Sequence, residues 1–234
     1  VPAPYSIYEG IKKLLPGHML CLKSPLGESD SQPYWSLEEV MNASKRTPFS
    51  GSEDEAVDEL EVRLKKSVKS RMVSDVPLGA FLSGGIDSSN IVALMQSQSD
   101  RPVNTFTIGF HEQQFNEAVH AKKVAQHLGT NHTELYINPQ EAMDVISKLP
   151  SMYDEPFADS SQIPTHLISA LARKHVTVAL SGDGGDELFA GYNRYLIAER
   201  LWKVAGRIPN ALKKGTADFV AGVSTKSVER FYGK

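Results

Sequence analysis

Cysteine is nearly absent from this chain, which has only Cys21 among its 234 residues. A single cysteine cannot form an internal disulfide or a multi-cysteine zinc site, and it fits a reducing compartment. Cys21 lies in an apolar run over residues 18–22, which is typical of a strand. We therefore expect a buried structural thiol at this position and a cytoplasmic protein.

Long apolar runs and an excess of basic residues are also missing. No stretch approaches the roughly 20 apolar residues that cross a bilayer, and the net charge is −3. This balance disfavours general binding to nucleic acid or to a membrane surface, because both need a basic excess. The first residues lack the charged and apolar regions of a signal peptide, and there is no initiator methionine. We expect small-molecule substrates, and a processed chain or a fragment.

The chain is predicted to contain three parts. Residues 1–36 combine a Pro-Gly turn, a short apolar strand and a polar loop, and they are too few to hold a core alone. Residues 37–51 are predicted to form a linker. Ser52 and Glu55 then form a capping box, which marks the first helix of the larger part, residues 52–234. Its tail, from about residue 192, is helical in composition and ends abruptly, which suggests truncation.

From residue 76 onward, apolar strands alternate with helical patterns. Strands are expected at 76–82, 103–110, 133–137 and 176–180, and helices at 88–98, 116–128 and 165–174. Gly129 is predicted to end the second of these helices, and Asn138 with Glu141 to cap a further one. Strands separated by helices pair in parallel, so the sequence predicts an α/β protein with a doubly wound parallel sheet.

Residues 83–88, with the sequence SGGIDS, lie between the first of these strands and its helix. Glycines allow the backbone to turn successive N–H groups inward, and a helix N-terminus adds the positive end of its dipole. The loop is therefore predicted to hold phosphate or pyrophosphate. Asp87 fits such a loop only if a cation such as Mg²⁺ lies between its carboxylate and the phosphate. A plain capped turn is the alternative, which the full six-residue pattern disfavours.

Two other phosphate-binding motifs do not fit. The chain has no G-x-x-x-x-G-K-[ST] sequence, which excludes a Walker-type loop. The sequence that starts at Gly182 matches the dinucleotide motif G-x-G-x-x-G only in part, because its sixth position is Glu187 instead of glycine.

A second loop, residues 181–187 with the sequence SGDGGDE, follows the fourth strand. So many glycines and carboxylates together are costly for folding, which indicates a function. Ligands of open α/β sheets bind at the carboxyl ends of strands, where the strand order reverses. If the first and fourth strands flank that point, the two loops face each other, and Asp87 and Asp186 could hold one Mg²⁺. A calcium loop is disfavoured because the D-x-[DN]-x-[DN]-G spacing is absent.

With both loops, the chain resembles the glutamine-hydrolysing asparagine synthetases along essentially its whole length. Residues 8–18 and 33–35 are similar to the end of that family's N-terminal glutaminase domain, and residues 52–234 to the beginning of its synthetase domain. The first loop is shared with the wider ATP pyrophosphatase group. The second loop, together with residues 188–192 (LFAGY), narrows the resemblance to this family. The resemblance to this family implies a parallel sheet of the adenine-nucleotide alpha-hydrolase type.

The resemblance also implies the chemistry of an AMP-forming ligase that uses ATP and Mg²⁺, with a homodimer as a possible assembly. A carboxylate, that of aspartate in the family type, attacks the α-phosphate of ATP, and ammonia from glutamine then displaces AMP from the acyl-adenylate. Asp183 is the implied catalytic residue, and Asp87 and Asp186 are the implied metal ligands. The implied contacts to ATP are Leu82 and Ile108 at the adenine, and Ser83, Gly84, Gly85, Asp87, Ser88, Ser181 and Gly182 elsewhere on the nucleotide.

Three features depart from the family pattern. Asp183 stands where better-known members have Glu, and relatives with this pattern include enzymes that amidate sugar acids. Cys21 does not match the N-terminal cysteine of the glutaminase domain, and the family's catalytic lysine lies beyond residue 234. We therefore expect an ATP site but little or no complete turnover. A sugar-acid amidotransferase, a β-lactam-forming enzyme and an ATP-sensing module without chemistry remain alternatives, the last disfavoured by the acidic second loop.

A third polar segment, residues 154–161 with the sequence DEPFADSS, also contains clustered carboxylates. These could reach a metal or an amine substrate. A surface turn fixed by Pro156 explains them equally well.

Overall fold

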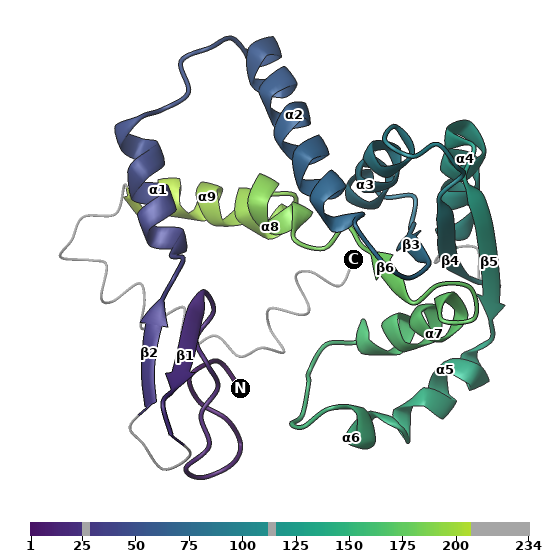
Figure 1. Cartoon of the computed structure of the whole chain (residues 1–234), viewed down its shortest axis with the longest axis horizontal. Helices are drawn as coiled ribbons and strands as arrows, with labels where there is room; N and C mark the ends of the chain where they lie inside the picture. The colour runs from purple at the N-terminus through teal and green to yellow at the C-terminus, as the bar shows by residue number, and fades with distance from the viewer. Residues whose placement is uncertain (25–28, 112–115, 207–234) are drawn as a thin grey trace. The chain divides into compact units, whose positions relative to one another are not determined.

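The computed structural model describes residues 1–24, 29–111 and 116–206 (Figure 1). The chain divides into two compact units, residues 1–182 and residues 183–234. The predicted linker at residues 37–51 lies inside the first unit, so the three-part division stays a prediction. The end of the predicted helical tail, residues 207–234, lies outside the described residues. Among the helices described, none has the length and apolar content needed to cross a membrane.

The N-terminal segment forms a two-stranded antiparallel sheet of β1 (His18–Leu22) and β2 (Ser29–Pro33), with His18 opposite Pro33. The strand predicted around Cys21 is confirmed. Its predicted burial is wrong, because Cys21 is exposed. Four of the five residues of β1 are exposed, so this apolar strand is not part of a hydrophobic core.

Part of the predicted linker is a helix, α1 (Leu37–Arg46). Ser36 caps it by accepting a hydrogen bond from the Glu39 N–H at 3.4 Å, and basic residues occupy its last turn. These local signals favour a helix although it buries none of its residues. The predicted helix that follows is confirmed as α2 (Glu53–Arg71), with the Ser52–Glu55 capping box in place.

The main sheet has four parallel strands in the order β5-β4-β3-β6 (Figure 1). These are β3 (Leu78–Phe81), β4 (Asn104–Phe110), β5 (Asn131–Ile137) and β6 (Val178–Leu180). All four were predicted within two residues of their observed ends, in line with the usual uncertainty of strand boundaries. In the register of the sheet, Ala80 lies between Thr105 on one side and Leu180 on the other.

Helices connect the strands. They are α3 (Ile86–Gln96), α4 (Ala118–Leu128), α5 (Pro139–Ile146), α6 (Leu149–Met152) and α7 (Gln162–Ala172). The predicted end of α4 and the predicted start of α5 are confirmed. Gly129 ends α4 with a φ of 69°, the left-handed conformation that glycine adopts without steric cost. Asn138 and Glu141 form the capping box of α5.

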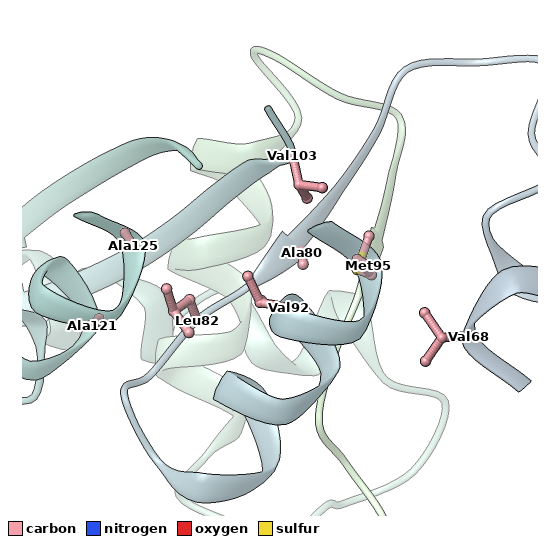
Figure 2. Packing of buried hydrophobic residues seen from close by; sticks show 8 residues of the cluster. All are labelled: Val68, Ala80, Leu82, Val92, Met95, Val103, Ala121 and Ala125. Atoms are coloured by element: carbon pink, nitrogen blue, oxygen red, sulfur yellow. The ribbon is translucent and has the colours of Figure 1, made fainter. Parts of the chain in front are cut away.

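Buried side chains lie on both faces of the sheet, which confirms the doubly wound arrangement. On one face, α3 and α4 pack against β3 around Leu82, Val92 and Ala121 (Figure 2). On the other face, Phe106 of β4 packs against Leu171 and Ala172 of α7. The helices on each face bury the apolar surface of the strands, so the carboxyl edge of the sheet is left for the loops that follow them.

Candidate functional site

The strand order places the switch point of the sheet between β3 and β6. From β3 the chain continues through β4 to β5 in one direction, and β6 then pairs with the other side of β3. Because β3 and β6 are parallel neighbours, the loops that follow them leave the sheet at the same edge. The prediction that the first and fourth strands flank this point is confirmed.

The first loop is held by hydrogen bonds between its own serines. The Ser83 N–H donates to Ser88 Oγ at 3.2 Å, and the two hydroxyl oxygens are 2.9 Å apart. The Gly85 N–H donates to Ser83 Oγ, and Ser88 Oγ donates to the Gly85 carbonyl. These bonds connect the two ends of the loop and hold its backbone through its own serine side chains.

The loop leads directly into the N-terminus of α3. Gly85 is the residue before the helix and supplies no side-chain hydrogen bond to it. The first N–H groups of a helix have no partner within the helix, and they carry the positive end of its dipole. Ile86 at this end is 81% exposed, so the end of the helix is open to solvent. A phosphate group fits this combination of exposed donors and positive potential.

Two glycines allow the surrounding backbone to approach the loop. Gly84 has a φ of 82°, and a Cβ placed on it would lie 2.6 Å from the Ala121 nitrogen of α4. A Cβ on Gly182, the residue after Ser181 at the end of β6, would lie 2.7 Å from the Ser88 nitrogen. Both separations are too short for any side chain. The predicted residues Gly84, Ser88 and Gly182 are therefore brought together at one edge of the sheet.

The other predicted residues of the first unit differ in their exposure. Asp87 is partly buried in the first turn of α3, and Ser83 and Gly85 are exposed. Ile108, near the end of β4, and Ser181 are partly buried. Leu82 is completely buried in the core beside Val92 and Ala121. Its side chain thus supports the loop from within the core, and its contact with adenine stays a prediction.

Asp183 and Asp186 belong to the second unit, which contains α8 (Gly185–Phe189) and α9 (Asn193–Gly206). Asp186 lies in the first turn of α8 and Asp183 is exposed. The Gly191 N–H donates to the Asp186 carbonyl at 3.0 Å, and a Cβ on Gly191 would lie 1.9 Å from an oxygen of the Asp186 carboxylate. The absence of a side chain at Gly191 therefore makes room for this carboxylate.

Tyr192 completes the local structure around the second loop. Its hydroxyl donates to Glu187 Oε1 at 2.6 Å, and this bond to a carboxylate raises the pKa of Tyr192 to about 12. The Arg194 guanidinium lies 4.0 Å from the centre of the Tyr192 ring, within the range of a cation–π contact. The Glu187 carboxylate is thus engaged within its own unit by the Tyr192 hydroxyl.

The sequence did not reveal two of these supporting contacts. The role of Gly191 in accommodating Asp186 depends on the turn after α8, where Ala190 has a φ of 56°. The close approach of α4 to Gly84 involves the buried Ala121 and the neighbouring His120. A small residue such as Ala121 on the buried face of a predicted helix is the signal that could have indicated a close contact.

Ser88 and the adjacent Ser89 provide a matched test of the loop. Ser88→Ala removes the acceptor of the Ser83 N–H, a partly buried hydrogen bond, and should destabilise the chain by about 0.5–1.5 kcal/mol. Ser89 Oγ is buried without a hydrogen-bond partner among the described residues. Ser89→Ala should therefore be neutral or stabilising by about 0.5 kcal/mol, because alanine also favours the helix. Urea denaturation measures both, and equal losses would contradict this role for Ser88.

Comparison with known proteins connects this site to a family. A family model described as asparagine synthase matches residues 59–232. The glutamine-hydrolyzing asparagine synthetase 1 of Bacillus subtilis is 39% identical over 214 residues, which are 92% of this chain and 32% of that protein. The putative glutamine-hydrolyzing asparagine synthetase 2 of Methanocaldococcus jannaschii is 39% identical over 202 residues, 86% of this chain and 38% of that protein.

The chain thus spans about a third of the length of these relatives. The solved structure of NMN synthetase from Francisella tularensis covers 61% of this chain and 59% of its own, with a TM-score of 0.40 and 18% identity. A TM-score this low supports no inference, so the fold assignment rests on the strand order described above.

Proposed function

The chain belongs to the asparagine synthase family, and from this premise we propose that it forms the ATP site of a glutamine-dependent, AMP-forming ligase. The observation that carries the proposal is the serine-fixed loop 83–88 at the switch point between β3 and β6. This loop and the open end of α3 provide donors for the β- and γ-phosphates, which leave together as pyrophosphate.

In the proposed reaction, the carboxylate of aspartate attacks the α-phosphate of ATP. The bond between the α- and β-phosphates breaks, giving an acyl-adenylate and pyrophosphate. Ammonia released from glutamine then attacks the acyl carbon, and AMP leaves. Asp183 is the proposed catalytic residue for adenylate formation and ammonia attack, and Ser181, Gly182 and Ile108 are proposed to contact the nucleotide.

Mg²⁺ is the proposed cofactor, and the residues present fit its chemistry. Mg²⁺ binds through one or two carboxylates and completes its six ligands with phosphate oxygens and water. Asp87 belongs to the phosphate loop 83–88 and lies, partly buried, in the first turn of α3. Asp87 and Asp186 would hold the ion, which would neutralise charge on the leaving pyrophosphate.

The family type of acceptor is aspartate. A sugar acid, or an amino acid that closes a β-lactam ring, would use the same two steps, because each requires only a carboxylate for adenylation and an amine for attack. A search for the acceptor should therefore include several carboxylates.

The test is ATP–pyrophosphate exchange by the complete protein that contains this chain. Exchange of labelled pyrophosphate into ATP should require a carboxylate, with aspartate and uronic acids screened in parallel. Asp87→Ala should lower the exchange rate by about 100-fold, the equivalent of losing roughly 3 kcal/mol of metal-assisted charge stabilisation.

Asp100→Ala is the matched control. Asp100 is exposed between α3 and β4, at the amino edge of the sheet, so its removal should leave the exchange rate unchanged. Exchange that needs no carboxylate would refute the ligase proposal. An unchanged rate in Asp87→Ala would refute the assignment of Asp87 as a metal ligand.

A further inference from the structure

Three contacts join the N-terminal segment, residues 1–17, to the loop at residues 153–161, and one of them is the ion pair between the Val1 amino group and Glu155 Oε1 at 3.4 Å. The Tyr8 hydroxyl donates to the Asp154 carbonyl at 3.0 Å. The Lys13 ammonium forms an ion pair and a hydrogen bond with the Glu155 carboxylate, whose side chain is only 20% exposed. Lys13 lowers the pKa of Glu155 by hydrogen bonding and by its charge. These partners are more than 140 positions apart in the sequence.

The loop 153–161 is also fixed from within. The Ser161 N–H donates to Asp159 Oδ1 at 2.8 Å, and Gln162 Nε2 at the start of α7 donates to the Phe157 carbonyl. The rings of Tyr153 and Phe157 are 5.3 Å apart. The carboxylates of Glu155 and Asp159 are thus engaged by the protein itself. This favours the fixed turn over the metal-binding alternative that the sequence left open.

The topology shows which edge of the sheet this loop occupies. Both β5 and β6 belong to one parallel sheet, so the connection between them must return from the carboxyl edge to the amino edge before β6 begins. In this connection α7 makes the return, since it packs on the sheet through Leu171 and Ala172 and is followed by β6. The loop before α7 therefore lies at the carboxyl edge, as do loops 83–88 and 181–182.

We infer that the N-terminal segment docks on loop 153–161, and that Tyr8 and Lys13 are positioning residues which fix this loop beside the ligand-binding edge of the sheet. A loop at this edge, outside the phosphate loop 83–88, is in a position to border the acceptor substrate, whereas loop 83–88 binds the phosphates of ATP. Its displacement should alter the fit of the acceptor carboxylate more than that of ATP. This last step rests on the proposed function, whereas the docking itself does not.

Limited proteolysis of the chain tests the docking. Tyr153 and Phe157 are 38% and 50% exposed, and chymotrypsin cleaves after aromatic residues. Lys13→Gln, Glu155→Gln and Tyr8→Phe should each raise the rate of cleavage in this loop about two- to fivefold, as expected for one partly exposed interaction. The Lys13→Gln/Glu155→Gln double variant should be cleaved no faster than Glu155→Gln alone, because the change at Glu155 already removes its ion pairs with both Lys13 and the Val1 amino group.

Lys12→Gln is the control for general effects of removing a positive charge, because Lys12 is exposed and forms no ion pair among the described residues. It should leave the cleavage rate unchanged. Independent, multiplicative effects of the Lys13 and Glu155 variants, or the same acceleration in Lys12→Gln, would overturn the docking.

Exchange kinetics of the complete protein test the positioning role. Lys13→Gln should raise the KM for the acceptor carboxylate two- to fivefold and leave the KM for ATP unchanged, and Lys13→Arg should restore it. An equal change in both KM values, or none, would overturn the role. If the wild-type protein shows no exchange at all, the proposed function fails, while the proteolysis experiment still decides the docking.

Discussion

Gly84→Ala should destabilise the chain by about 2–5 kcal/mol. Gly84 has a φ of 82°, a left-handed conformation that costs a residue with a Cβ about 1–2 kcal/mol in steric energy. The new Cβ would also lie 2.6 Å from the Ala121 nitrogen and 2.8 Å from the Cβ of His120. Helix α4 can relieve this clash only by moving away from the loop, and such overpacking costs about 1–3 kcal/mol more. Equilibrium urea denaturation measures the loss.

Two other glycines separate the causes of this effect. Gly129 has a φ of 69° but open space around its Cβ position, so Gly129→Ala should show only the backbone cost of about 1–2 kcal/mol. Gly85 has a φ of −71°, and its Cβ would approach only Ser83 Oγ, at 3.3 Å. Gly85→Ala should stay within about 1 kcal/mol of the wild type. A Gly84→Ala loss no larger than that of Gly129→Ala would contradict the close contact with α4.

Gly182→Ala should abolish most of the exchange activity of the complete protein. The added Cβ would meet the Ser88 nitrogen at 2.7 Å and the Asp87 carbonyl carbon at 2.9 Å. Both are main-chain atoms of the first turn of α3, which cannot rotate away as a side chain can. The clash therefore has to move the phosphate loop relative to β6. A displacement of about 1 Å at a reacting centre costs on the order of 100-fold in rate, which is the loss we expect.

The control for Gly182→Ala is a similar clash far from the loop. A Cβ on Gly79 in β3 would lie 2.8 Å from the Asn104 carbonyl oxygen and 2.7 Å from the Phe106 ring. Gly79→Ala should thus destabilise the fold by about 1–3 kcal/mol, and the molecules that remain folded should exchange pyrophosphate at nearly the wild-type rate. Equal activity per folded molecule in the two variants would show that Gly182 has no special role in placing the loop.

The sequence predicted those parts of the fold that depend on local interactions. The capping residues Ser52 and Asn138 and the stop at Gly129 each act within one turn of backbone, so their patterns can be recognised directly. The alternation of strands and helices similarly indicated the parallel sheet. The chemical character of loop 83–88 could be inferred because glycine, serine and aspartate have few reasons to occur together after a buried strand.

What the sequence could not predict depends on contacts between distant residues. Cys21 was expected to be buried because an apolar strand usually faces a core, yet β1 pairs with β2 and leaves the thiol exposed. Residues 37–51 were predicted to be a linker because of their composition, although acidic residues in the first turn of α1 and basic residues in its last turn favour a helix. The pairing of Lys13 with Glu155 joins two segments more than 140 positions apart, and neither segment carries a pattern that identifies the other.

The hydrogen bonds between Ser83 and Ser88 also decide which donors of the loop can reach a phosphate. The N–H groups of Ser83 and Gly85 donate to serine oxygens of the loop itself. In the proposed function, the phosphate oxygens would therefore be bound mainly by the first N–H groups of α3, which have no partner within the helix. The serines would set the shape of the loop, and the end of the helix would supply the positive potential.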